Sequence, residues 1–154
     1  MNEKDIRIVK LEPMRVASAY AFGNSPEEAA LAKMGRFVEE KKLLVDGQMP
    51  PTFGFNNPNP AAGSPNYGYE VWLAVEESIE PAGDIRILDF AGGLYAVAPC
   101  RELKNIGSEW LALAKWREGT QYAAGKQQWL EHLLSPLDAQ PETFEFDLYL
   151  PIAE

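Results

Sequence analysis

The chain carries one pattern twice, and this repeat limits its possible folds more than any other feature. The tetrapeptide Asp-Ile-Arg-Ile at residues 5–8 returns at residues 84–87, and the similarity continues beyond it without a gap. A length of 154 residues suits one domain with a substantial core. We therefore expect a single domain, residues 1–154, built from half one at 1–78 and half two at 79–154, with a cleft where the halves meet.

A second pair of matching segments closes the two halves. Residues 69–75 align with residues 146–152, and all but one of the aligned positions pair aromatic with aromatic, acid with acid or aliphatic with aliphatic. Glu70 and Asp147 are the two aligned acids. The repeat therefore predicts that these two carboxyl groups occupy equivalent places, one in each half.

Hydrophobic periodicity predicts an α+β fold. Each half is expected to run strand, strand, helix, strand, with its first two strands joined as a hairpin, and the glycines at 92 and 93 are a turn signal for the second hairpin. The sheet should be mostly antiparallel, with the helices packed on one side. The predicted strands are residues 5–11, 15–22, 67–75, 84–91, 94–100 and 144–152, and the predicted helices are 26–44, 103–118 and a short additional one at 127–134.

Residues 46–68 form the least regular segment. Five prolines and four asparagines fall within it, which argues against a helix or a central strand. Long loops inside compact domains are uncommon and often functional. A rigid surface connection is one interpretation. The aromatic residues Phe53 and Phe55 favour another, in which residues 50–66 form a lid over the cleft and one of these rings contacts a ligand.

Composition excludes several classes of function. The formal net charge is −9, and an acidic surface repels phosphate backbones, so we expect no nucleic-acid partner. No run of residues has the length and apolarity of a membrane span, and no signal-peptide pattern is present, so we expect no membrane partner. Cys100 is the only cysteine, which fits a reducing cytoplasm.

The sequence gives no indication of a metal or cofactor. A single cysteine cannot form a cysteine-based metal site, and His132, the only histidine, is expected to face solvent on the short helix. The common hydrolase and nucleotide-binding motifs are missing from the sequence. We therefore expect no metal and no cofactor.

Acids and aromatic residues share one face of two predicted strands. Glu70 and Trp72 lie two residues apart, and Asp147 and Tyr149 repeat that spacing. Acids are costly to bury without partners, whereas a ligand cleft accommodates both acids and rings. Such a cleft would attract an organic cation through ring faces and carboxylates. The alternative is an exposed alternating strand whose acids are merely solvated.

Three segments resemble a known family. They are residues 53–58 (Phe-Gly-Phe-Asn-Asn-Pro), residues 67–72 (Tyr-Gly-Tyr-Glu-Val-Trp) and residues 147–152 (Asp-Leu-Tyr-Leu-Pro-Ile). With the repeat order, they resemble the GyrI-like small-molecule-binding domains, which also occur as effector-binding domains of AraC-type and MerR-type multidrug regulators. The resemblance implies a two-fold pseudo-symmetric domain in which Glu70 and Asp147 are the cleft acids. It covers essentially the whole chain and, without a helix-turn-helix, implies a stand-alone sensor.

The expected function is binding of amphipathic cationic molecules, as a drug-sensing or sequestering module. A hydrolase of reactive toxins is an alternative, with Glu70 activating water and Tyr69, Tyr95 or Trp72 orienting the substrate. A protein-interaction module that inhibits a topoisomerase-like partner is another. Trp110 and Trp116 lie six residues apart on the second helix, so at most one of them lines the cleft. The predicted ligand-binding residues are Glu70, Trp72, Asp147, Tyr149, Phe55, Phe53, Tyr69, Tyr95 and Trp110.

Overall fold

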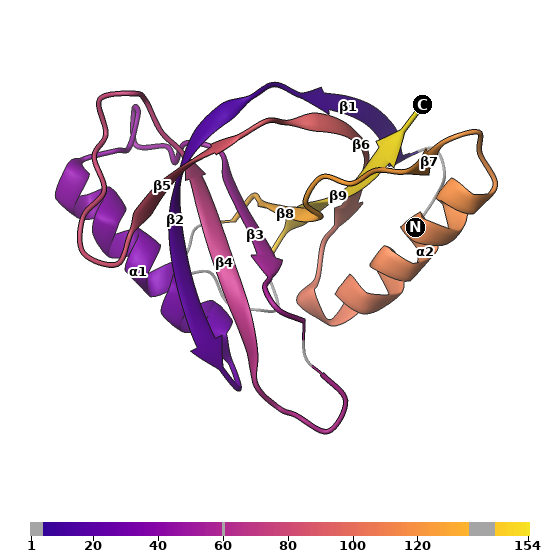
Figure 1. Ribbon diagram of the computed structural model, residues 1–154, viewed down its shortest axis with the longest axis horizontal. Helices are drawn as coiled ribbons and strands as arrows, with labels where there is room; N and C mark the ends of the chain where they lie inside the picture. Colours follow the sequence, from indigo (N-terminus) through magenta and orange to yellow (C-terminus); the bar gives the residue numbers. More distant parts are fainter. Residues whose placement is uncertain (1–4, 60, 136–143) are drawn as a thin grey trace. The chain divides into compact units, whose positions relative to one another are not determined.

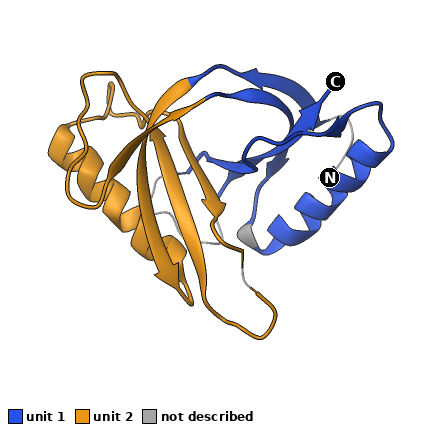
Figure 2. Ribbon diagram, viewed as in Figure 1, with its two compact units in different colours: residues 1–13, 91–154 blue, residues 14–90 orange. Residues whose placement is uncertain are grey.

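The computed structural model describes residues 5–59, 61–135 and 144–154 and consists of two compact units. Unit 1 contains residues 1–13 and 91–154, and unit 2 contains residues 14–90 (Figure 2). Each unit therefore draws its first and last strands from different halves of the sequence.

Unit 2 is a helix on an antiparallel sheet (Figure 1). Its strands lie in the order β3-β4-β2-β5. The helix packs on β2 and β4, where Ala17, Ala19, Val71 and Leu73 are fully buried. Small and aliphatic side chains at these positions let the helix approach the sheet closely. The elements are β2 (Met14–Gly23), α1 (Pro26–Lys41), β3 (Thr52–Asn56), β4 (Tyr67–Ala74) and β5 (Arg86–Phe90).

Unit 1 has the same plan. Its strands lie in the order β1-β6-β9-β8, with β7 paired to the C-terminal end of β9, and α2 packs on β6 and β9. The elements are β1 (Arg7–Leu11), β6 (Gly93–Cys100), the 3-10 turn η2 (Leu103–Asn105), α2 (Ile106–Glu118), β7 (Ala123–Ala124), β8 (Leu130–Leu133) and β9 (Phe146–Ala153).

The registers of the two units match residue by residue. Ser18 lies opposite Arg86 in unit 2, and Val97 lies opposite Arg7 in unit 1. Phe55 lies opposite Glu70, and His132 lies opposite Asp147. This agreement confirms the α+β, antiparallel and two-fold repeated fold. It also extends the repeat to strand, strand, helix, strand, strand.

Both predicted hairpins are wrong. β1 pairs with β6 and β5 pairs with β2, so the two halves exchange their first strands. Gly92 and Gly93 mark the start of β6 instead of a hairpin turn. Gly92 has a φ of +78°, and a Cβ there would lie 2.1 Å from the carbonyl oxygen of Leu11. A glycine is therefore required by the close approach of β1.

Two further predictions are wrong, and both concern the additional strand of the repeat. The proline-rich segment contains a buried strand, β3, and the predicted helix at 127–134 contains the strand β8. These strands are equivalent, since each pairs with the acid-bearing strand of its unit. The prolines lie outside β3 and so do not interrupt it. In the second case Leu130 and Leu133 have helical spacing, but they are also the two buried ends of a four-residue strand.

The other predicted elements are confirmed with small changes at their ends. The first helix begins at Pro26 as expected but ends at Lys41 instead of residue 44, because Lys42 adopts a left-handed conformation. The second helix ends at Glu118. Within the described residues, every helix is too short or too polar to cross a lipid bilayer.

Candidate functional site

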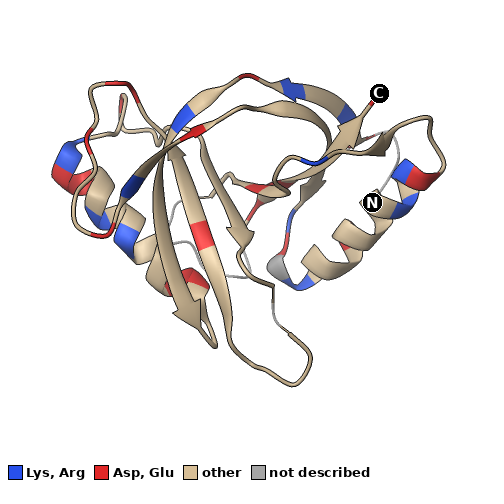
Figure 3. Cartoon of the chain, in the orientation of Figure 1, with Lys and Arg blue, Asp and Glu red and all other residues tan. Residues whose placement is uncertain are grey.

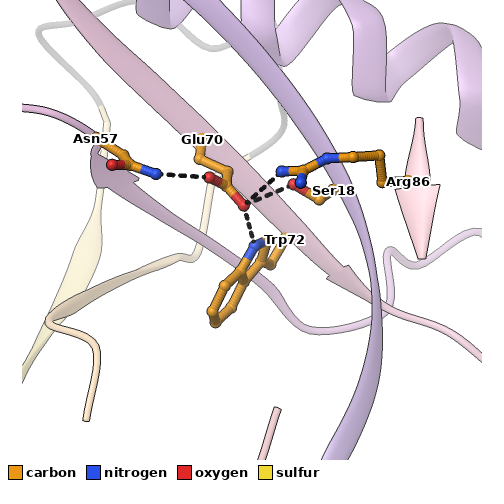
Figure 4. Close-up of polar contacts among 5 residues, drawn as sticks. All are labelled: Ser18, Asn57, Glu70, Trp72 and Arg86. Carbon is orange, nitrogen blue, oxygen red and sulfur yellow. Dashed lines mark hydrogen bonds and ion pairs between the residues drawn. The ribbon is translucent and has the colours of Figure 1, made fainter. Parts of the chain in front are cut away.

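Glu70 is the centre of a buried polar cluster in unit 2. It is the only charged residue of β4, visible as the red band on that strand in Figure 3, and it is 4% exposed. Its Oε2 accepts hydrogen bonds from Ser18 Oγ at 2.7 Å and Trp72 Nε1 at 2.6 Å (Figure 4). Its Oε1 accepts one from Asn57 Nδ2 at 3.1 Å. All three donors are neutral. A carboxylate only accepts hydrogen bonds, so it suits a position surrounded by donors.

The strand register explains this cluster. Ser18 lies opposite Trp72 on the neighbouring strand, so both side chains project from the same face as Glu70. Asn57 is held by its backbone, since its N–H donates to the carbonyl of Gly68 at 2.7 Å. A Cβ at Gly68 would lie 1.9 Å from the Asn57 carbonyl oxygen. The glycine of the Tyr-Gly-Tyr-Glu run therefore allows Asn57 to reach Glu70.

Arg86 provides the positive charge of the cluster. Its Nη2 lies 3.6 Å from Glu70 Oε2, and its side chain is 59% exposed (Figure 4). This distance is that of an ion pair longer than a hydrogen bond. Arg86 is the arginine of the second Asp-Ile-Arg-Ile segment, so the sequence repeat marks a partner of the acid.

Aromatic rings lie beside the Glu70 carboxylate. The Trp72 ring is 4.8 Å from that of Phe55, edge to face, and 5.1 Å from that of Phe90. Phe55 comes from β3 and Phe90 from β5, so the row crosses the sheet of unit 2. We call Glu70, Ser18, Asn57, Trp72, Phe55, Phe90 and Arg86 the Glu70 cluster.

Unit 1 places Asp147 in the equivalent position. Arg7 Nη2 donates to Asp147 Oδ2 at 2.8 Å, and its side chain is 51% exposed. The ring of Tyr149 lies 5.4 Å from that of Tyr95 and 6.0 Å from that of His132. We call these five residues the Asp147 cluster.

Burial shifts the ionisation of the groups around Asp147. It lowers the pKa of His132, against the opposing effect of the Asp147 charge. It raises the pKa of Tyr149, and the nearby Arg7 partly offsets that rise. The pKa of Tyr95 is also raised, mainly by burial, and its hydroxyl donates to the Gln128 carbonyl. The neutral forms of the imidazole and both phenols are therefore favoured.

The other predicted ligand residues lie in several places. Tyr69 lies on the opposite face of β4 from Glu70, the face that also carries Tyr67, whose hydroxyl donates to Glu27 of α1. Phe53 is buried in β3 opposite Trp72. Trp110 packs against Trp129 in unit 1, 5.2 Å between ring centres.

Several residues of these clusters were not predicted. Ser18, Asn57, Phe90 and the two arginines carry no recognisable motif for acid binding, although the arginines stand in the repeat. His132 was wrongly expected to face solvent from a helix, whereas it is half-buried in β8. In the described parts of the chain, no group of three or more His, Cys, Asp or Glu side chains is arranged to hold a metal ion.

Comparison with known families identifies the domain. Residues 7–152 match the model of the Cass2 family, described as integron-associated effector binding protein. The chain belongs to this effector-binding family. It is a GyrI-like domain, as the resemblance of its sequence implied. No curated protein matches its sequence.

Solved structures share the fold of this effector-binding domain at low sequence identity. The C-terminal domain of EcmrR is 11% identical, with a TM-score of 0.70 and coverage of 97% of each chain. A hydrolase from Listeria innocua is 13% identical, with a TM-score of 0.65 and coverage of 99% of this chain and 94% of that one. SAV2435, solved bound to tetraphenylphosphonium, is 11% identical, with a TM-score of 0.57 and coverage of 96% and 93%.

Proposed function

We propose that this effector-binding domain binds hydrophobic organic cations, with Glu70 as the counter-charge. The observation that carries the proposal is a carboxylate only 4% exposed beside the aromatic row Phe55, Trp72 and Phe90. Ring faces attract cations, and a carboxylate in an apolar setting strengthens this attraction and opposes anions. A ligand that satisfies both groups is apolar and positively charged.

Neutral donors strengthen the argument. Ser18, Trp72 and Asn57 orient the carboxylate without neutralising its charge. Its charge therefore stays available to a ligand, apart from the looser contact with Arg86. The tetraphenylphosphonium bound to SAV2435 is a cation of this class, and the two proteins share a fold.

The remaining predicted contacts belong to the proposal as well. Phe53, Tyr69, Asp147, Tyr149, Tyr95 and Trp110 stay predicted ligand contacts. The proposed lid, residues 50–66, now includes the strand β3, and residue 60 lies outside the described residues. The aqueous cytoplasm is the proposed location.

Calorimetric titration with tetraphenylphosphonium and with tetraphenylborate tests the proposal, because the two ions match in shape and differ in charge. The wild type should bind the cation and discriminate against the anion. Glu70→Gln should weaken cation binding by about 1.5–3 kcal/mol, the range for an interaction with a charged group. The exposed Glu77→Gln removes the same charge elsewhere and should leave binding unchanged. Equal binding of both ions, or an unaffected Glu70→Gln variant, would contradict the proposal.

Hydrolysis of a reactive small molecule is the second candidate. It is favoured by the fold shared with a Listeria innocua hydrolase and by the buried carboxylate of Glu70. Only one hydrogen bond to Oε1, from Asn57, is seen among the described residues, so this oxygen can accept a further one from a water molecule. Strained electrophiles, such as cyclopropane-bearing compounds, are suitable substrates for the test. Product analysis should detect turnover by the wild type and none by the Glu70→Gln variant.

A further inference from the structure

We propose that Arg86 is a built-in competitor for the ligand, a tethered cation that occupies the charge site of Glu70 and sets how strongly the site prefers cations. The inference rests on the proposed function and adds a specificity-determining residue to it. Arg86 comes from β5, lies opposite Ser18, and extends toward Oε2 of Glu70 (Figure 4).

The geometry separates the role of Arg86 from that of the other contacts. Oε2 already accepts short hydrogen bonds from Ser18 and Trp72, which use its two lone pairs. Arg86 Nη2 stands at 3.6 Å from this oxygen and contributes charge without a hydrogen bond. A ligand cation that interacts through charge alone can therefore replace Arg86 and leave the hydrogen bonds of Ser18 and Trp72 in place.

Because the Arg86 side chain is exposed, its displacement by a ligand costs little free energy. The Arg86 side chain is 59% exposed, whereas that of Glu70 is 5% exposed. A displaced guanidinium can extend into water and lose little, because most of the Arg86 side chain is already solvated. The carboxylate cannot follow it, since three neutral donors hold it in the sheet. In the proposed exchange, Arg86 is therefore the partner that moves and Glu70 the partner that stays fixed.

The equivalent pair in unit 1 is closer. Val97 stands there in the place of Ser18 and cannot donate a hydrogen bond. Arg7 hydrogen-bonds Asp147 directly at 2.8 Å. The longer Arg86–Glu70 distance therefore follows from the Ser18 and Trp72 donors that occupy Oε2.

The test combines charge variants of Arg86 with the two matched ions. Arg86→Gln should bind tetraphenylphosphonium roughly twofold to fivefold more tightly than the wild type, the factor that corresponds to an exposed ion pair. The same variant should bind tetraphenylborate more weakly. Arg86→Lys, which keeps the charge, should behave as the wild type. Arg36→Gln, an exposed change of the same charge on α1, should alter neither affinity.

Opposite shifts for the two ions distinguish charge competition from a general disturbance of the fold, which would weaken both. In a Glu70→Gln background, Arg86→Gln should no longer tighten cation binding. Unchanged or weaker cation binding by Arg86→Gln, with Glu70→Gln still damaging, would overturn the role of Arg86 and leave the proposed function intact. A wild type that does not bind the cation, or an undamaged Glu70→Gln variant, would overturn both.

Discussion

Unit 2 and unit 1 hold equivalent acids with different partners. Glu70 accepts hydrogen bonds from three neutral donors and has its arginine at 3.6 Å, whereas Asp147 accepts a direct hydrogen bond from its arginine at 2.8 Å. The strand order and register are the same in both units. One backbone plan therefore supports a carboxylate held mainly by neutral donors and another held by a direct hydrogen bond from arginine. The difference comes from a few side chains, above all Ser18 in place of Val97.

The largest expected effect concerns the residues opposite the two acids, Phe55 and His132. Phe55 is 5% exposed and packs edge to face on Trp72. Phe55→Ala should lower the free energy of unfolding by about 3–5 kcal/mol, as for other buried phenylalanines. His132→Ala should cost less, because the imidazole is only half-buried. Urea unfolding of both variants measures the difference. Weaker ligand binding by Phe55→Ala with an unchanged melting temperature would instead support a lid residue.

The second comparison concerns the aromatic residues beside the acids, Trp72 and Tyr149. Trp72→Phe keeps most of the ring but removes the indole N–H that donates to Glu70 Oε2. A buried carboxylate oxygen that loses a donor should cost about 1–3 kcal/mol. Tyr149→Phe removes the hydroxyl that interacts with Arg7. It should cost less, because Arg7 is half exposed and water can replace the hydroxyl. Equal losses in urea unfolding would contradict the distinction between an acid held by neutral donors and an acid paired with arginine.

Local pattern was enough to predict most of the fold but not the strand pairing. The repeat correctly predicted that Glu70 and Asp147 are equivalent, and periodicity placed both long helices. Neither the repeat nor the periodicity could show which copy of the first strand pairs with which copy of the second strand. Both copies have the same pattern, so β1 on β2 and β1 on β6 look alike in the sequence. The choice depends on contacts between distant residues, such as Leu11 against Gly92.

The clusters were predictable in part, for the same reason. Alternation along β4 correctly placed Glu70 and Trp72 on one face. Their partners Ser18, Asn57 and Arg86 come from three other segments and meet only through strand register. A strand as short as β8 has too few residues to show a period of two, so its leucines suggested a helix.

The third comparison concerns the stability contributed by the two arginines. Arg7→Gln breaks a hydrogen-bonded pair, whereas Arg86→Gln breaks a longer contact of an exposed side chain. An ion pair whose arginine is exposed contributes up to about 1 kcal/mol, and we expect the loss for Arg7→Gln to be the larger of the two. Chemical unfolding at low ionic strength is the suitable measurement. A larger loss for Arg86→Gln would show instead that the Arg86–Glu70 pair contributes more stability than the Arg7–Asp147 pair.

The finest comparison concerns pH, because only the Asp147 cluster contains a histidine. Burial lowers the pKa of His132 in the folded protein, with Asp147 raising it and Arg7 lowering it. An unfolded histidine titrates near pH 6.5. As the pH falls through that value, the unfolded chain takes up a proton that the folded protein resists, so stability falls. His132→Phe, which copies the residue found at 55, should lose less stability between pH 7.5 and 5.5 than the wild type, and His132→Asn should do the same. Urea midpoints of all three proteins at both pH values measure this. Equal losses in all three would show that His132 is protonated as readily in the fold as in the unfolded chain.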